Sequence, residues 1–243
     1  MRKILLSISI IVIFFFISFS SLAQQNFFNV PSSDITKKYL FFFQQQINFY
    51  ATSIVSNSTL CYGLGRNYEI GFNILGITYN KGTKSFLSNS FNELPIFPSM
   101  GVNAQKKVLE SKQYSLALGG QLLFPAQIRQ PEWYSFINNK LEFDDIRLVV
   151  GLYSGNSNYF GAETKFLNNM KLIGFQLGIE YQLIKDKVFI QSDFISGKTP
   201  LSNLIFGAVY KFNIKYLFSL GYQFSNSRTS SSDGFVFEIT FLQ

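Results

Sequence analysis

The feature that most constrains the fold is a period-two alternation of apolar and polar side chains that returns along the chain. In residues 68–74, Tyr68, Ile70, Phe72 and Ile74 fall on one face of an extended segment, opposite Glu69, Gly71 and Asn73. Similar runs cover residues 176–183, 204–212, 218–224 and 235–241. This period predicts β-strands, each with two chemically different faces.

The composition of the two faces indicates which of them meets solvent. The apolar face is heavily aromatic, and the polar face is rich in Gly, Glu, Gln and Lys. A soluble sandwich also alternates, with its apolar face inside, whereas a membrane barrel turns an aromatic-rich apolar face toward lipid. Hydrophobic residues make up 47% of the chain, and after residue 23 the longest apolar run is only 39–43. In a membrane, only a closed barrel would satisfy the backbone of such a chain. We therefore predict an all-β, transmembrane antiparallel barrel.

Turn residues divide the alternating pattern into about twelve strands. They are expected at 41–51, 58–64, 68–79, 99–109, 114–124, 145–154, 159–166, 172–183, 188–196, 203–212, 215–224 and 234–242. Short connections at 65–67, 184–187 and 213–214 would be periplasmic turns, and 80–98, 125–144, 197–202 and 225–233 would be surface loops. The strands at 99–109 and 159–166 have the weakest patterns, and without that pair the barrel would have ten strands.

The N-terminal region has the order of a secretory signal peptide. Arg2 and Lys3 precede an apolar stretch at 4–19, and the small residues Ser21 and Ala23 suit a signal peptidase. We predict a cleaved signal peptide at 1–23, a periplasmic lead-in at 24–40 and the barrel at 41–243. The alternatives are an uncleaved anchor for the first segment and a plug inside the lumen for the second.

Three stretches carry a resemblance to known proteins. They are residues 42–49 (FFQQQINF), 62–71 (YGLGRNYEIG) and 192–197 (SDFISG). Together they resemble outer-membrane barrels of Bacteroidetes-type bacteria and, more loosely, the "meta-pathway of phenol degradation" putative transporter family. The resemblance implies a barrel in the outer membrane with transport as its role, and it assigns no catalytic or binding residue.

The composition argues against several classes of function. The chain contains no histidine, which removes Ser-His-Asp and Cys-His catalysis and imidazole metal sites. Its single cysteine, Cys61, cannot form an internal disulfide. The formal charge is +7, but the basic residues are scattered, so nucleic acid is not an expected partner. We expect no enzyme, no cofactor and no metal site.

Strand parity predicts which side chains line the lumen. The candidates with chemistry are Glu69, Asn73, Asn103, Lys107, Arg147, Glu163, Lys165, Glu180, Asp193, Lys211, Lys215 and Glu238. Neutral inward groups would include Gln44, Gln46, Asn48, Gln105, Gln176, Gln182, Gln191 and Gln223. The ten charges, five of each sign, either line a polar path or pair across the lumen and fill it.

The aromatic residues Trp133, Tyr134 and Phe136 fall in the expected loop 125–144. They could fold into the mouth of the barrel and contact an apolar solute. Nothing in their spacing aims them inward, so the rim is their expected position.

These observations predict passive or weakly selective passage of small solutes across the outer membrane of a Gram-negative bacterium. The solute is not identified. The expected partners are membrane lipid, lipopolysaccharide and the barrel-assembly machinery, which would recognise the aromatic-alternating strand Phe235–Phe241. The alternative is a filled structural barrel whose surface loops bind a partner in a secretion or uptake assembly.

Overall fold

The computed structural model describes residues 26–84, 98–126, 130–160, 165–166, 170–171, 173–197, 199, 201–226 and 232–243. Twelve antiparallel strands close into one barrel, which confirms the predicted fold class and strand count. The barrel strands are β1 (Phe41–Tyr50), β2 (Ser53–Gly65), β3 (Tyr68–Asn80), β4 (Ser99–Glu110), β5 (Tyr114–Pro125), β6 (Glu132–Phe143), β7 (Ile146–Gly155), β10 (Ile173–Ile184), β11 (Val188–Ile195), β12 (Asn203–Lys211), β13 (Tyr216–Ser225) and β14 (Gly234–Leu242). The short helix α2 (Ser157–Phe160) and the two-stranded sheet of β8 (Lys165–Phe166) and β9 (Met170–Lys171) are not part of the barrel sheet.

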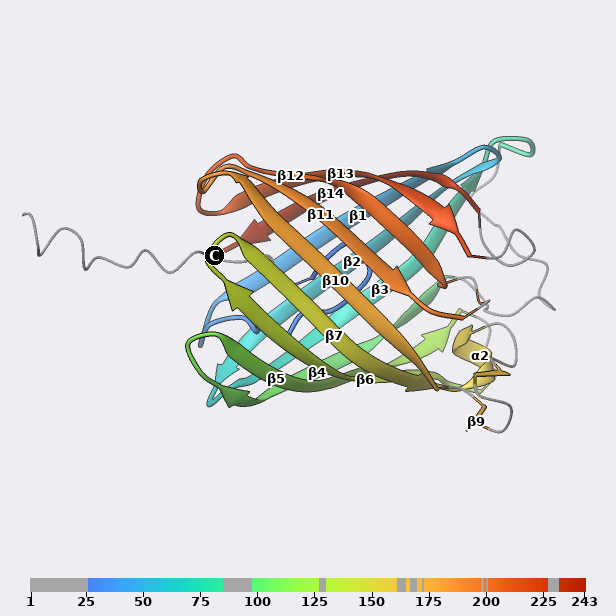
Figure 1. Cartoon of the computed structure of the whole chain (residues 1–243). Coiled ribbons are helices and arrows are strands. Elements are labelled where there is room, and N and C mark those ends of the chain that lie inside the picture. Colours follow the sequence, from blue (N-terminus) through green and yellow to red (C-terminus); the bar gives the residue numbers. More distant parts are fainter. Residues whose placement is uncertain are drawn as a thin grey trace, which may run out of the picture.

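The barrel closes where β14 pairs with β1, with Phe42 opposite Leu242 and Tyr50 opposite Gly234. The two ends of the barrel differ (Figure 1). The turn end carries the short connections, and the C-terminus lies beside them; α2 lies at the other end, which we call the loop end. Arg66 and Asn67 at the turn end both have positive φ, which matches the tight twisted turn that joins β2 to β3.

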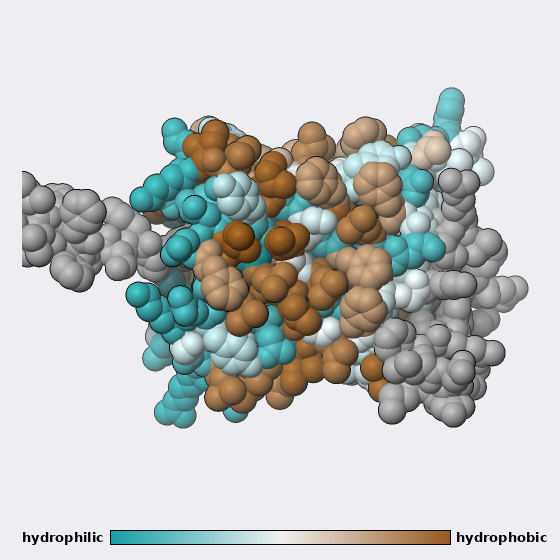
Figure 2. All heavy atoms as spheres, in the orientation of Figure 1, coloured by the Kyte–Doolittle hydropathy of each residue, from teal (hydrophilic) through white to brown (hydrophobic). Residues whose placement is uncertain are grey.

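The outer face of the wall is apolar and exposed. Phe72, Phe206 and Leu220 are among many large hydrophobic side chains that point away from the lumen. Figure 2 shows a hydrophobic band on the visible face of the barrel, with a hydrophilic rim at the turn end. Within the described ranges, no helix is long and apolar enough to cross a bilayer. Since a soluble monomer rarely exposes so large an apolar area, the band is the lipid-facing surface of the barrel.

Two predicted elements are wrong. Residues 132–143, expected in a surface loop, form the barrel strand β6 between β5 and β7. The strand expected at 159–166 is absent from the wall, because residues 157–160 form α2 and residues 165–166 form β8. The errors cancel in the strand count. The segment 161–164 lies outside the described residues.

Residues 26–36 lie inside the barrel, and the exposed residues 37–39 lead from them toward β1; we call the whole segment 26–40 the plug. This corrects the periplasmic lead-in expected for 24–40, of which residues 24 and 25 are not described. Phe27 and Val30 have no exposed surface, and a bridge between Asn26 and Pro31 makes this part of the plug a tight hairpin. Residues 26–30 thus lie in the lumen that the strands from β1 to β14 enclose.

The plug is attached to the wall at Gly63 on β2. The backbone N–H of Tyr39 donates to the Gly63 carbonyl at 2.7 Å, and the Gly63 N–H donates to the Leu40 carbonyl at 3.1 Å. A side chain at position 63 would collide with the carbonyl groups of Thr36 and Lys37. Glycine is therefore the residue that lets the plug backbone approach the wall so closely. We call this contact the Gly63 anchor.

Candidate functional site

The tip of the plug is held by the inner face of β10–β13. Asp193 accepts hydrogen bonds on Oδ2 from the backbone N–H groups of Asn29 and Val30, at 2.6 and 2.8 Å. The Phe27 ring lies against Gly178, and Arg147 stacks over the same ring at 4.8 Å from its centroid. A carboxylate that receives two backbone N–H groups fixes the hairpin in one position.

The middle of the plug is held by charge. Asp34 forms ion pairs with Lys140 at 2.6 Å and with Arg147 at 3.3 Å, and Arg147 also pairs with Glu180 at 3.0 Å. Burial raises the pKa of the Asp34 carboxyl, but the charges of Lys140 and Arg147 outweigh it, so the pKa lies below its ordinary value of 3.8. The plug therefore carries an ionised carboxylate that partners two cations of the wall.

Hydrogen bonds hold the plug against β3, β4 and β5. Both the N–H and the hydroxyl of Thr36 donate to Oε2 of Glu69 at 2.6 Å. The Gln105 amide donates to the Ser32 carbonyl at 2.8 Å, and the Ser33 and Ser115 hydroxyls contact each other. The plug thus bonds to strands all around the barrel.

An apolar layer occupies the turn end of the lumen beside the plug. It consists of Phe42, Cys61, Phe189, Val209, Leu217 and Leu242. These side chains come from β1, β2, β11, β12, β13 and β14, and all of them are buried. Together with the plug, they occupy space in the lumen at this end.

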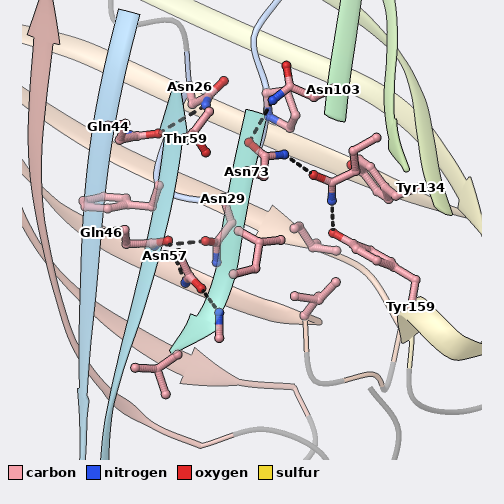
Figure 3. A pocket seen from close by; sticks show the side chains of 18 of the residues that line it. Asn26, Asn29, Gln44, Gln46, Asn57, Thr59, Asn73, Asn103, Tyr134 and Tyr159 are labelled. Atoms are coloured by element: carbon pink, nitrogen blue, oxygen red, sulfur yellow. Dashed lines mark hydrogen bonds between the residues drawn. The ribbon is translucent and has the colours of Figure 1, made fainter. Parts of the chain in front are cut away.

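A cavity of about 520 Å³ remains in the lumen, lined by β1–β6, α2 and the tip of the plug. This volume falls in the range of small-molecule sites, about 300–1,000 Å³. It runs from Tyr50 and Asn80 at the loop end toward Glu69, and Asn29 borders it from the plug. Figure 3 shows Gln44 and Gln46 of β1 on one side of the cavity and Tyr134 and Tyr159 on the other.

Carboxamide groups form the polar surface of the cavity. A relay of hydrogen bonds runs from Asn103 through Asn73 and Gln121 to the Tyr159 hydroxyl, with donor–acceptor distances of 2.6–2.8 Å. Gln46 joins the wall to the plug by donating to Asn29 at 3.1 Å. These bonds hold the amides in fixed orientations, which is the condition for selective recognition of a ligand.

Two cavity-lining amides carry a buried atom that has no hydrogen-bond partner within the part of the chain that the structure describes. They are Nε2 of Gln44, a donor, and Oδ1 of Asn48, an acceptor. Both side chains belong to β1 and are more than nine-tenths buried. An unsatisfied buried polar group costs about 1–3 kcal/mol. A cavity wall that bears this cost has unused capacity for a polar ligand.

The structure places most of the predicted lumen residues on the inner face. These are Glu69, Asn73, Asn103, Lys107, Arg147, Glu180, Asp193, Lys211 and Glu238, with Lys211 half-buried at the end of β12. Lys215 is misplaced, because it lies exposed in the turn between β12 and β13. Glu163 falls outside the described residues, and Lys165 lies in β8, away from the barrel wall. Of the predicted lumen charges, Arg147 pairs with Glu180 of the neighbouring strand and also with Asp34 of the plug.

The aromatic residues assigned to a rim also need correction. Trp133, Tyr134 and Phe136 lie on β6, where alternation separates them. Trp133 is exposed on the outer face, whereas Tyr134 and Phe136 line the cavity. Sequence analysis also missed Glu132, Asn138 and Lys140 on the same inner face, although residues 132–140 do contain a period-two pattern.

No protein-family model matches the chain, and no curated protein matches it in sequence. Solved outer-membrane barrels do match it in structure. A KdgM porin has a TM-score of 0.54 at 9% identity, over 82% of this chain and 98% of that one. A NanC porin has a TM-score of 0.52 at 8% identity, over 82% of this chain and 97% of that one. At such low identity the likeness shows the fold alone. This fold, with its apolar outer band, is that of a Gram-negative outer-membrane barrel of the porin-like kind.

Proposed function

We propose that the protein is a gated channel through which small polar solutes cross the outer membrane, with the plug as its gate. The observation that carries this proposal is the division of the lumen. A preformed polar cavity lies toward the loop end, while the plug and the apolar layer occupy the turn end. In this proposal the loop end faces outward, solute enters the cavity, and movement of residues 26–40 completes the path.

Fold similarity supports the proposal in a general way, because structural neighbours of the chain include the KdgM and NanC porins. The resemblance to the "meta-pathway of phenol degradation" family remains a sequence prediction, and the chemistry of the cavity described below points to a different kind of solute. The second candidate is a filled structural barrel that displays its loops to a partner. The extensive bonding of the plug to the wall favours this candidate.

A disulfide lock distinguishes these functions. The Ser33 and Ser115 hydroxyls are in contact, so Ser33→Cys with Ser115→Cys would tie the plug to β5. Cys61→Ser in the same chain removes the competing thiol. We expect discrete single-channel steps from the reduced protein in a planar bilayer, and a silent protein after oxidation, with conductance restored by a reductant.

Two other outcomes would overturn the proposal. A folded barrel that stays silent in both redox states would favour the structural barrel. Equal conductance in both states would show that solutes pass beside a plug that does not act as a gate. The matched control is the chain with Cys61→Ser alone, whose conductance should not respond to oxidation.

A further inference from the structure

We propose that the cavity binds an uncharged, polyhydroxylated solute of the saccharide class. This inference rests on the proposed function in one respect, since it takes the cavity as the place where the transported solute enters. Three properties of the cavity carry it: the absence of cationic groups from its described lining, the unused donor and acceptor on β1, and the aromatic surface opposite them.

The charge of the cavity disfavours anionic solutes. Among the lining residues that the structure describes, the acids are Glu69 and Glu132, and neither lysine nor arginine is present. Glu69 already binds Thr36 of the plug, and Glu132 accepts a hydrogen bond from Ser99 at 3.0 Å. An anion would therefore meet two carboxylates and no cation. Neutral donors do not cancel the carboxylate charges, so the case against a cation rests on the unused amide groups of β1.

The unused groups on β1 call for a partner that both donates and accepts. Gln44 Nε2 offers a hydrogen, and Asn48 Oδ1, four residues further along the same face, offers a lone pair. A lone anion would satisfy the first group, and a lone cation would satisfy the second. A hydroxyl donates one hydrogen bond and accepts others, so a molecule with several hydroxyls matches both positions.

The opposite side of the cavity is aromatic. Tyr134 lies between Phe136 and Tyr159, with ring centroids 5.8 and 5.3 Å away. All three rings line the cavity, and the Tyr159 hydroxyl is held by Gln121. A sugar ring has hydroxyls around its edge and C–H groups on its faces, so its edge can bond to amides while a face packs on aromatic rings. Figure 3 shows this opposition of amides and tyrosines.

The inference is tested by binding rather than by transport. Isothermal titration calorimetry of the detergent-folded full barrel would compare neutral di- and trisaccharides (maltose, cellobiose, lactose, maltotriose) with trigalacturonic acid and with a fully deacetylated chitotriose. We expect at least one neutral sugar to bind at micromolar to millimolar concentration and the two charged sugars to bind at least about tenfold more weakly.

Variants then test whether the measured heat of binding comes from binding in the cavity. Gln44→Leu and Asn48→Leu each remove one unused group, and each should weaken binding about tenfold while the barrel remains heat-modifiable in gel electrophoresis. The matched control is Gln191→Leu, which removes a buried inward amide of β11 that does not line the cavity. Its affinity should equal that of the parent.

The outcomes separate this inference from the proposed function. A redox-gated channel that binds none of the neutral sugars, or binds a charged one more tightly, would overturn the ligand class and leave the gate standing. A barrel that is silent in both redox states but binds a neutral sugar through Gln44 and Asn48 would support the site and reject the channel. An equal loss of affinity in Gln191→Leu would overturn the placement of the site.

Discussion

Asp34 and Arg147 are 113 positions apart in the chain, and their side chains lie 3.3 Å apart inside the barrel. One belongs to the plug, and the other is the second residue of β7. Arg147 holds Glu180 with its other terminal nitrogen, so a single guanidinium ties the plug to two strands of the wall. Because arginine presents its donors in a rigid fork, it can bond to both carboxylates at once.

Removal of the Asp34 charge should loosen the plug. Asp34→Asn removes one of two carboxylates from each cation, because Lys140 keeps Glu142 and Arg147 keeps Glu180. Breaking a buried ion pair costs roughly 3–5 kcal/mol when a charge is left unpaired, so the cost here should be smaller. Hydrogen exchange should show faster exchange of the plug amides, including those of Asn29 and Val30. Asp144→Asn is the control, because Asp144 lies exposed in the turn between β6 and β7. Unchanged protection of the plug in Asp34→Asn would contradict the role of this ion pair.

The Asp34 contact of the plug should respond to acid only at low pH. The pKa of Asp34 is depressed in the folded barrel, so its contribution to stability is complete above its unfolded value, ordinarily 3.8, and is lost as pH falls through the folded value. We therefore expect the Asp34 contact to hold the plug equally at pH 7 and pH 5 and to weaken below about pH 4. Single-channel recording over this range, with Asp34→Asn as the reference that lacks this carboxylate, would check the expectation. Opening of the parent near pH 6 would argue against Asp34 as the group that responds.

A methyl group at position 178 should displace the tip of the plug. A Cβ built on Gly178 would lie 2.9 Å from the Phe27 ring, closer than such contacts normally come. Gly178→Ala should therefore weaken the plug by about 1–3 kcal/mol, the usual cost of overpacking. Urea titration followed by exchange of the Val30 amide would measure the change. Gly82→Ala is the matched control, since nothing lies within 4 Å of its added Cβ, and an equal effect of both would refute the contact.

A charge on the lipid-facing side should hinder folding into a bilayer. Phe206 lies near the middle of β12 and is 55% exposed on the outer face. Phe206→Arg should cost about 2–4 kcal/mol in a lipid vesicle, whereas Phe212→Arg at the turn end should cost about 0–1 kcal/mol. Reversible folding in vesicles, followed by urea titration, gives both values. Similar costs at the two positions would mean that the band is not lipid-facing.

The sequence predicted the wall better than its contents. Alternation identified eleven barrel strands because each strand has a lipid face and a lumen face of opposite character. It missed β6, where both faces are mixed. The inner face combines Tyr134 and Phe136 with polar residues, and the outer face combines Trp133 and Ile137 with Ser135 and Asn139. A strand whose two faces are not of opposite character escapes the rule by which the others were found, and the aromatic wall of the cavity was missed with it.

The plug could not be inferred from periodicity. Alternation says how a strand divides its side chains, but it does not say where a segment without regular structure lies. The signals were the adjacent rings Phe27 and Phe28 and the carboxylate of Asp34, none of which has a preferred place in an extended lead-in. Their partners, Gly178, Gly207 and Arg147, are distant in sequence and become visible only once the barrel has closed.

The Gly63 anchor determines how a force on the plug would be distributed. Traction on residue 26 would reach the ion pairs of Asp34 and the bonds of Thr36 before it reached β1. Those contacts are separate and can break one after another. The paired backbone bonds at Gly63 are loaded last, and beyond them lies β1, which closes the barrel with β14. The anchor is therefore a mechanical stop, which lets the plug leave the lumen while the seam of the barrel carries no load.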